Sequence, residues 1–247
     1  MDDFWTHKEN MPAEKSGYGQ FTLKHFFLLA VSVFLIASFV ILYQRSDEAK
    51  KILLLRSVAF TLIFIDVIKM ILIHRSDVKL SDYLPLEICS FAAYFIVLDS
   101  VFTGNTIFPD MLLTLFLPAA IMAILFPTTS TLPMCNFYTI HQFLYHALII
   151  AYIMARFLSR EIPLTYPGVW TSILQILLLA GIIYLIDTRY DKNFMFLRDP
   201  YGNPLLGLIW KYTKGGFRYT LGLVAFCIVM IHVFFVFFKL IAFLFLH

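Results

Sequence analysis

The chain contains seven apolar runs, and each run is long enough to cross a lipid bilayer as an α-helix. A spanning helix needs about 20 mostly apolar residues. The runs lie near residues 23–43, 52–73, 84–102, 107–126, 138–158, 169–186 and 219–244. Of all residues, 60% are hydrophobic and only 14% are charged, whereas soluble domains carry about 25% charged residues. We therefore expect an all-α fold, a polytopic membrane bundle of about seven transmembrane helices.

Two segments outside the runs complete the expected organisation. Residues 1–22 are polar and mixed in charge, which indicates a solvated N-terminal tail before a single transmembrane domain at 23–247. The longest connection, at about 187–218, contains a turn-rich stretch and then apolar residues that end with Trp210 and Lys211. This pattern predicts a short helix in the membrane interface. Pro118 lies inside the fourth run and predicts a kink there.

The distribution of charge predicts an orientation and excludes one class of partner. Loops on the N-terminal side of the bundle hold more Lys and Arg than the loops on the other side. Since cytoplasmic loops collect these residues, we expect a multi-pass protein of the cell membrane with its N-terminus in the cytoplasm. The net charge of +3 is too small to indicate nucleic-acid binding. The expected partners are membrane lipids, and the sequence leaves the oligomeric state open.

The cysteine and histidine spacing indicates neither a disulfide framework nor a metal site. The three cysteines form no Cys-x-x-Cys pair. Cys135, His141 and His146 are separated by six and five residues, which places the two histidines about 140° apart around a helix. Two histidines that share one metal on a helix are usually four residues apart. We therefore expect no metal and no other cofactor.

Ionisable residues inside apolar runs are costly and mark candidate functional positions. Asp66 and Lys69 are three residues apart, so they share a helix face and can neutralise each other. Asp99 lies near the end of its run, where we expect it to reach the interface or cap the helix. Gln142 lies four residues before His146, and its amide can orient the imidazole.

Cys89 and His146 begin their runs from the same side of the membrane, and Lys69 and Asn193 lie on that side too. A thiolate is a strong nucleophile once a base takes its proton, so the pair can carry an acyl group as a thioester. The alternative is that Cys89 is a small apolar residue in a helix and that His146 is a hydrogen-bonding residue between helices.

Three segments give the chain a resemblance to a known family. They are Leu-Pro-Leu-Glu-Ile-Cys at 84–89, Phe-Leu-Tyr-His-Ala-Leu-Ile-Ile at 143–150 and Asn-Phe-Met-Phe-Leu at 193–197. Together they resemble the bacterial YwaF-like integral membrane proteins, which are similar to the eukaryotic TMEM-type cysteine acyltransferases of ether-phospholipid remodelling. The resemblance extends from about residue 50 onward.

This resemblance implies a seven-span fold in which Cys89 accepts the acyl group, His146 is its partner and Asn193 is the polar residue of the following loop. Glu87 departs from the pattern, because we expect a histidine at that position. A carboxylate cannot replace an imidazole as a base near neutral pH. His141, on the helix that holds His146, is a candidate substitute.

Two functions follow from these observations. In the first, the protein is a lipid acyltransferase or acyl hydrolase, in which His146 deprotonates Cys89 and the thiolate attacks a phospholipid ester. In the second, it is a non-enzymatic membrane protein that binds or transports a small solute or a lipid. A polar cavity lined by Lys69, Glu87, His146 and Asn193 would serve that second function.

Overall fold

The computed structural model of the chain describes residues 3–12, 17–102 and 107–245, and this part contains helices and no strand. The main helices are α1 (Leu23–Gln44), α2 (Glu48–His74), α3 (Ile88–Val101), α4 (Ile107–Met111), the π-helix η3 (Leu112–Phe116), α5 (Leu117–Leu125), α6 (Phe137–Leu158), α7 (Tyr166–Tyr190), α8 (Pro204–Thr213) and α9 (Gly216–Phe245). Single 3-10 turns are η1 (Lys8–Asn10), η2 (Leu80–Asp82) and η4 (Phe194–Phe196).

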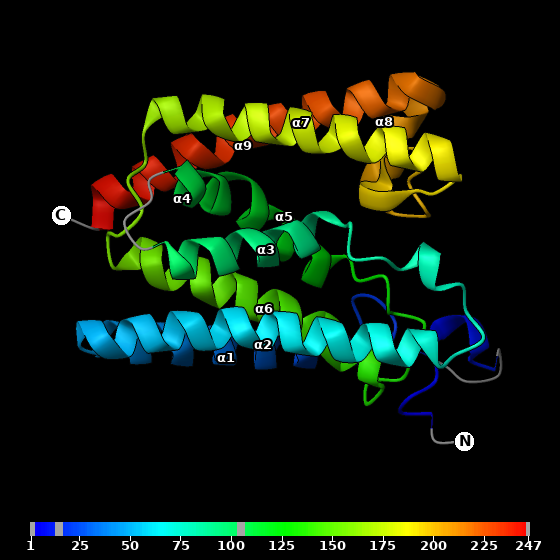
Figure 1. Cartoon of the computed structure of the whole chain (residues 1–247), viewed down its shortest axis with the longest axis horizontal. Helices are drawn as coiled ribbons and strands as arrows, with labels where there is room; N and C mark the ends of the chain where they lie inside the picture. The colour runs from blue at the N-terminus through cyan, green and yellow to red at the C-terminus, as the bar shows by residue number, and fades with distance from the viewer. Residues whose placement is uncertain (1–2, 13–16, 103–106, 246–247) are drawn as a thin grey trace.

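The polytopic helical bundle expected from the sequence is confirmed. Within the described residues, six helical stretches are long and apolar enough to cross a membrane, and α3 is a shorter apolar helix of 14 residues. The first and last described residues lie at opposite ends of the bundle in Figure 1, which agrees with an odd number of passages. The seventh passage is α3, which starts at Ile88 rather than at the expected residue 84.

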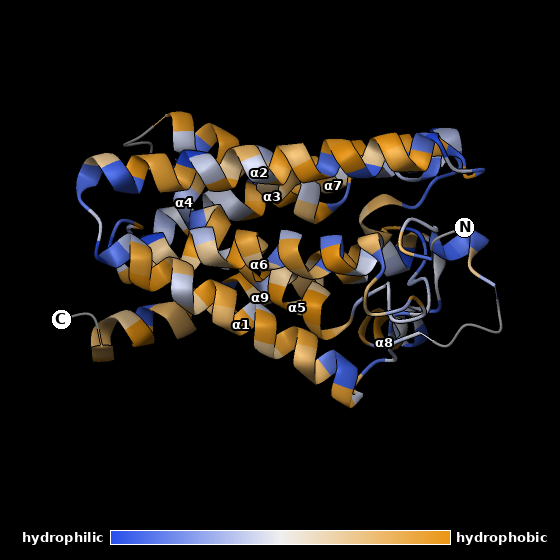
Figure 2. Ribbon diagram, turned by 90° about the horizontal axis from the view of Figure 1, so that it is seen from below, coloured by the Kyte–Doolittle hydropathy of each residue, from blue (hydrophilic) through white to orange (hydrophobic). Residues whose placement is uncertain are grey.

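The order in which the helices pack explains which of them face lipid. Helix α6 lies in the middle and packs against α1, α2, α3, α5 and η3. Helices α1 and α9 lie on the outside and expose large apolar side chains such as Phe34 and Phe243. Helix α2 also exposes a large apolar side chain, Phe60. Figure 2 shows that most residues along α1 and α9 are hydrophobic. An exposed apolar surface of this extent is what a lipid-facing helix requires.

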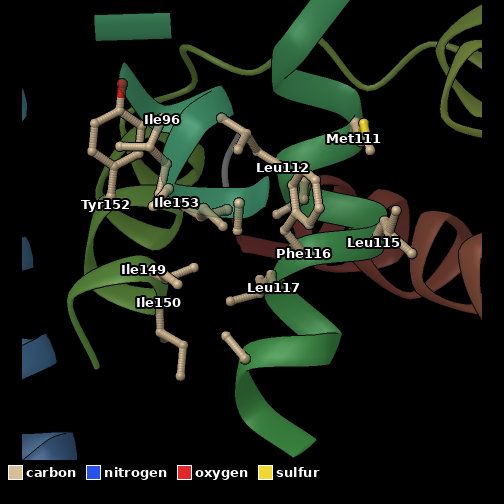
Figure 3. Packing of buried hydrophobic residues seen from close by; sticks show 14 of the residues in the cluster. Ile96, Met111, Leu112, Leu115, Phe116, Leu117, Ile149, Ile150, Tyr152 and Ile153 are labelled. Carbon is tan, nitrogen blue, oxygen red and sulfur yellow. The ribbon is translucent and has the colours of Figure 1, made fainter. Parts of the chain in front are cut away.

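The centre of the bundle contains the irregular helix predicted from Pro118. The backbone N–H of Leu117 donates to the carbonyl of Leu112, five residues earlier, which is the π-helical pattern. Pro118 lies in the first turn of α5, where a residue without an N–H is tolerated. Farther along a helix its missing N–H would interrupt the hydrogen-bond ladder. Residues of η3 such as Phe116 are fully buried against Ile96 of α3 and Ile153 of α6 (Figure 3). The π-turn therefore lies inside the buried apolar core.

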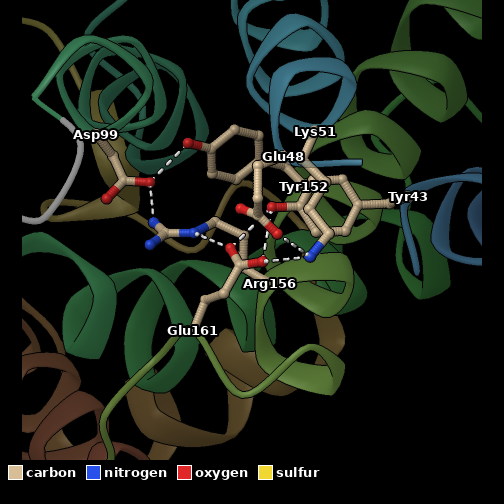
Figure 4. Close-up of polar contacts among 7 residues, drawn as sticks. All are labelled: Tyr43, Glu48, Lys51, Asp99, Tyr152, Arg156 and Glu161. Atoms are coloured by element: carbon tan, nitrogen blue, oxygen red, sulfur yellow. Dashed lines mark hydrogen bonds and ion pairs between the residues drawn. The ribbon is translucent and has the colours of Figure 1, made fainter. Parts of the chain in front are cut away.

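A buried ionic network joins α1, α3 and α6 at the end of the bundle where α1 ends (Figure 4). Asp99 is 4% exposed and accepts hydrogen bonds from the Tyr152 hydroxyl at 2.6 Å and from the Arg156 guanidinium. Arg156 also donates to Glu161 at 3.3 Å, and Glu161 accepts from Tyr43 at 2.8 Å. The prediction that Asp99 reaches the interface or caps α3 is therefore wrong, because its partners lie on α6.

The described part of the N-terminal segment packs on the bundle and is not the solvated tail predicted for 1–22. The amide of Asn136 donates to the carbonyls of Asp3 and Thr6 at 2.6 and 2.9 Å. Tyr18 is 2% exposed, and its backbone N–H donates to the carbonyl of Leu132 at 2.9 Å. Residues 1–2 and 13–16 of that prediction lie outside the described part of the chain.

The short helix predicted between the last two passages is present as α8. Asn203 caps it by accepting from the backbone N–H of Leu205 at 3.0 Å, and Pro204 occupies the first turn. Helix α8 packs against α9, while Leu208 and Tyr212 remain exposed. Such an apolar and aromatic outer face suits the boundary between lipid and water.

Candidate active site

A cavity of about 1150 Å³ lies at the end of the bundle that holds the N-terminal segment. Its walls come from the N-terminal segment, α2, the start of α3, η3, α5, α6, α7, α9 and the loops before α3, α6 and α8. The cavity exceeds the roughly 300–1,000 Å³ of ordinary small-molecule pockets. It therefore has room for a ligand larger than a simple metabolite.

Seven of the eight residues predicted from the sequence line this cavity. They are Lys69, Glu87, Cys89, His141, Gln142, His146 and Asn193. The eighth, Asp66, lies directly behind the wall, because its Oδ1 is 2.5 Å from the Nζ of Lys69. The fold thus brings the candidate nucleophile and the candidate base into one cavity, although no hydrogen bond joins Cys89 to His146 among the described contacts.

Cys89 is the second residue of α3, and this helix begins deep in the bundle. The hydroxyl of Tyr145 donates to the carbonyl of Cys89 at 3.4 Å. Tyr145 is eight residues after the start of α6 at Phe137, which is a distance of about 12 Å along that helix. The amino end of α3 is therefore recessed below the amino end of α6, and the cavity occupies the space in front of it.

His146 is held in one orientation by the backbone of its own helix. Its Nδ1 lies 2.6 Å from the carbonyl oxygen of Gln142. A carbonyl can only accept, so Nδ1 carries the proton and Nε2 is the basic nitrogen. The prediction that the Gln142 amide orients the ring is wrong, since that amide donates to the carbonyl of Ala123 at 3.0 Å. The carbonyl of Gln142 does what its side chain was expected to do.

The predicted pair between Asp66 and Lys69 is present, and His141 lies beside it. The Nε2 of His141 lies 3.7 Å from the Oδ1 of Asp66. The ring of His141 stacks on Tyr145, with centroids 5.2 Å apart, and Tyr145 meets His146 edge to face at 5.7 Å. This stack joins the ion pair on α2 to the two histidines of α6 along the cavity wall.

Glu87, which stands where the family resemblance leads us to expect a histidine, binds the loop that follows α7. Its carboxylate accepts from the backbone N–H of Met195 at 2.8 Å. Burial raises the pKa of Glu87 to about 7, the Met195 N–H and Lys69 oppose that rise, and the carboxylate of Asp187 adds to it. The side chain can therefore exchange a proton near neutral pH.

The loop after α7 is held in a strained conformation by many hydrogen bonds. Asp191, Met195 and Phe196 all have positive φ, at 51°, 55° and 56°, which is costly for residues other than glycine. The side-chain oxygen of Asn193 accepts from the N–H groups of Arg198 and Asp199 at 2.8 and 3.0 Å. Asn193 thus shapes the polar loop beside Cys89, and its amide nitrogen donates to the Asp199 carbonyl at 2.9 Å.

Polar residues surround the outer end of the cavity. The ring of His7 meets that of Tyr83 at 4.7 Å, and the Tyr83 hydroxyl donates to Glu9. Burial lowers the pKa of His7 to about 4, so this residue is neutral at physiological pH. Lys192 pairs with Asp82 across the same region. These contacts connect the N-terminal segment to the loops before α3 and α8.

One side of the cavity is mainly apolar. It is formed by η3, α5, α7 and α9 and includes Leu115, Met122, Ile176, Ala180, Leu223 and Phe226. A cavity with one apolar side and charged groups at its outer end suits an amphiphile, whose tail avoids water and whose head does not.

Several contributors to the site were not identified from the sequence. Tyr145 lies in the segment 143–150, one of the three that carry the family resemblance. Nothing in its spacing indicates the contact with Cys89. Met195 acts through its backbone N–H, which no residue type reveals. His7 and Glu9 belong to a segment whose polar composition is typical of solvated tails. Only the three-dimensional packing places these groups at the cavity.

The profile of the TMEM164 family matches residues 20–238. These residues include α1 to α8, most of α9 and all eight predicted site residues. The chain belongs to the TMEM164 family. No curated protein and no solved structure matches it. As a TMEM164-family protein, the chain is a multi-pass membrane protein, and the match begins before α1 and ends within α9.

Proposed function

We propose that this TMEM164-family protein is a phospholipid acyltransferase or acyl hydrolase that carries the acyl group as a thioester on Cys89. The observation that supports the proposal most is that Cys89 and His146 line one cavity, while the Gln142 carbonyl leaves Nε2 of His146 as the basic nitrogen. The resemblance to YwaF-like proteins and cysteine acyltransferases assigns these two residues the same roles.

The reaction needs only groups that this chain supplies. Nε2 of His146 takes the proton of the Cys89 thiol, and the thiolate attacks the carbonyl carbon of an ester. The ester C–O bond then breaks, and the imidazolium returns its proton to the leaving alcohol. A second alcohol, or water, then attacks the thioester carbonyl while Nε2 of His146 takes its proton. The C–S bond breaks, and the proton returns to the sulfur of Cys89. A lysolipid as the second alcohol makes the protein a transferase, and water makes it a hydrolase.

The shape of the cavity favours a lipid as the substrate. An acyl chain fits against the apolar side formed by η3, α5, α7 and α9, and the charged outer end suits a phosphate-containing head group. We further propose that this outer end faces the cytoplasm at the cell membrane, because the bias of Lys and Arg places the N-terminus there. Membrane lipids reach such a cavity from the surrounding leaflet.

The proposal is tested with the purified full chain in nanodiscs that contain phospholipid with a radiolabelled acyl chain. We expect label on Cys89, identified by mass spectrometry, that hydroxylamine removes. Cys89→Ala and His146→Ala should both abolish labelling, while Cys135→Ala, which changes an exposed cysteine, should not. Absence of label on Cys89 in the folded wild-type protein, across several phospholipids, would contradict the proposal.

A second candidate function is non-enzymatic binding or transport, and the ion pair of Asp66 with Lys69 at the cavity wall favours it. Paired charges within a membrane protein are common along substrate paths. A lipid or solute that stabilises Cys89→Ala and wild-type protein equally against heat, with no label on Cys89, would support this function over the enzymatic one.

A further inference from the structure

We propose that the backbone N–H groups of Ile88 and Cys89 form an oxyanion-binding site for the acyl carbonyl that Cys89 attacks. This inference rests on the proposed acyl transfer and adds the group that stabilises its transition state. Donors fixed where negative charge develops are often the largest single contribution to catalysis of acyl transfer.

The amino end of α3 has two donors without acceptors. A helix leaves its first N–H groups without partners in the helix, and the N-cap side chain usually accepts one of them. Here Glu87 is the N-cap, and its side chain makes no capping hydrogen bond because it binds Met195 instead. The N–H groups of Ser90 and Phe91 donate to the Glu87 carbonyl. No described residue accepts from Ile88 or Cys89.

A second observation indicates that a ligand belongs at this end of the helix. His146 is 6% exposed, its Nδ1 is bonded to the Gln142 carbonyl, and no described residue is bonded to its Nε2. Ile88, Cys89 and His146 all line the cavity. The Tyr145 hydroxyl on the Cys89 carbonyl brings α6 against the first turn of α3. A buried base without a partner thus faces the same cavity as two donors without acceptors.

The three groups have complementary roles in one step. As the thiolate forms the C–S bond, the electron pair of the carbonyl double bond moves to its oxygen. That oxyanion accepts hydrogen bonds from Ile88 and Cys89, and the positive end of the α3 dipole favours its charge. When the C=O bond forms again, the ester C–O bond breaks, and His146 protonates the leaving oxygen. The nucleophile's own N–H serves the same purpose in other acyl-transfer enzymes.

One donor can be removed without disturbing the helix. Ile88 is the first residue of α3, where proline is well tolerated because its N–H would be unpaired in any case. Glu87 before it has extended backbone angles, φ −78° and ψ 158°, as a residue before proline requires. Ile88→Pro therefore deletes the N–H, and Ile88→Ala is the matched control that keeps the N–H and loses the side chain.

The experiment compares two reactions of the same thiol in full-length protein in nanodiscs. p-Nitrophenyl butyrate acylates Cys89 through an oxyanion, whereas iodoacetamide alkylates it without one. Site-resolved mass spectrometry gives both rates at Cys89, and the exposed Cys135 is an internal reference. We expect the ratio of acylation to alkylation at Cys89 to fall about 100-fold in Ile88→Pro and to change little in Ile88→Ala. Equal ratios in the two variants would overturn the proposal.

A second pair of variants tests the site without proline. Glu87→Ser introduces a side chain that can cap α3 and occupy the Cys89 N–H, so the same ratio should fall. Glu87→Gln keeps the length needed to reach Met195 and should retain the ratio; no difference between these two variants would count against the proposal. A dependence on Ile88 without any acylation by phospholipid would retain the oxyanion site and reject the lipid substrate.

Discussion

The carboxylate of Glu87 accepts a hydrogen bond from the backbone N–H of Met195 at 2.8 Å, across 108 residues of sequence. This contact binds the residue that precedes α3 to the strained loop that follows α7. Glu87 is the N-cap of α3, but its side chain makes no capping hydrogen bond, which leaves the first turn of α3 open to the cavity. One side chain therefore determines both the position of the loop and the state of the helix end beside Cys89.

The first prediction concerns the pH dependence of stability caused by Glu87. Burial raises its pKa from 4.5 in the unfolded chain to about 7, so the folded state holds a proton that the unfolded state releases. Stability is therefore lost as pH rises from about 4.5 to 7. Glu87→Gln removes this titration and keeps an acceptor for Met195. We expect the variant to gain on the order of 1 to 3 kcal/mol over wild type at pH 8.

The measurement is the thermal unfolding midpoint in detergent at pH 5 and at pH 8. Lys69, Lys8 and Asp187 also act on Glu87 and are unchanged in the variant. Asp77→Asn in the exposed turn after α2 is the control for effects of pH on the detergent and the surface. A stability difference between Glu87→Gln and wild type that is the same at both pH values would contradict the prediction.

The second prediction concerns the buried pair of Asp99 and Arg156. Arg156→Met leaves the Asp99 carboxylate buried with only the Tyr152 hydroxyl as partner, which should destabilise the protein by about 3–5 kcal/mol. Replacing both residues, Asp99→Leu with Arg156→Met, removes the charge and should recover most of the loss. Denaturation in mixed micelles measures both, with the exposed Arg160→Met as control. A double variant as unstable as the single one would refute this account.

The third prediction compares two glycines of α7. A Cβ on Gly168 would lie 1.6 Å from Oδ2 and 2.8 Å from Cβ of Asp110, so the whole Asp110 side chain would have to move. Asp110 is buried and accepts from Thr165 at 3.2 Å. We expect Gly168→Ala to destabilise the protein by about 1–3 kcal/mol. Gly181→Ala meets nothing within 4 Å and should stabilise the helix by about 0.5–1 kcal/mol.

Thermal unfolding of the two alanine variants and wild type, side by side in one detergent, gives the sign of each change. Both substitutions add the same methyl group to the same helix, so helix propensity cannot explain opposite signs. Similar midpoints for the two variants would show that α4 adjusts to the added methyl group and that the contact with Asp110 is not restrictive.

The fourth prediction concerns the order of the loop that Asn193 shapes. Asn193→Ala removes the two hydrogen bonds accepted from Arg198 and Asp199 and the one donated to Asp199. Because Met195 and Phe196 have positive φ, the loop should relax once these bonds are lost. We expect at least 10-fold faster amide hydrogen exchange over 193–199, roughly the effect of 1.4 kcal/mol.

Asn193→Asp is the informative control, because an aspartate still accepts from both N–H groups and loses only the donated bond. Its hydrogen exchange over 193–199 should lie between wild type and Asn193→Ala. Exchange in the wild-type loop that is already as fast as in Asn193→Ala would show that the hydrogen bonds do not restrain the backbone.

Most of the fold follows from the sequence because long apolar runs in lipid have one stable backbone arrangement. All seven predicted runs match helices within four residues at each end, and Pro118 predicts the irregular turn at η3. Helix α3 is shorter than its run, which begins at 84. The Leu86 N–H donates to the Leu84 carbonyl in a tight turn, and Glu87 then turns to Met195, so the helix starts later.

The residues that line the site could be predicted from the sequence more completely than the groups to which they are hydrogen-bonded. Intramembrane charge and the shared side of the membrane identify Cys89, His146 and Lys69 as neighbours of one cavity, which the structure contains. The partners of Gln142 and Asp99 could not be predicted, because each lies on another helix, at Ala123 and Arg156. Spacing along one helix determines which face a residue occupies, but the rotation of neighbouring helices determines what that face meets.

The shortness of α3 has a consequence for the place of Cys89 in the membrane. Its 14 residues extend about 21 Å, while the hydrocarbon layer is about 30 Å thick. Its far end is level with that of α6 through Asp99 and Arg156, so the deficit lies wholly on the Cys89 side. Non-helical backbone is tolerated at membrane depth only where protein surrounds it or where it lines a cavity. Beyond the amino end of α3, the N-terminal segment, the loops before α3 and α8 and the cavity that they line fill the missing length, so Cys89 lies below the membrane surface with protein rather than lipid above it.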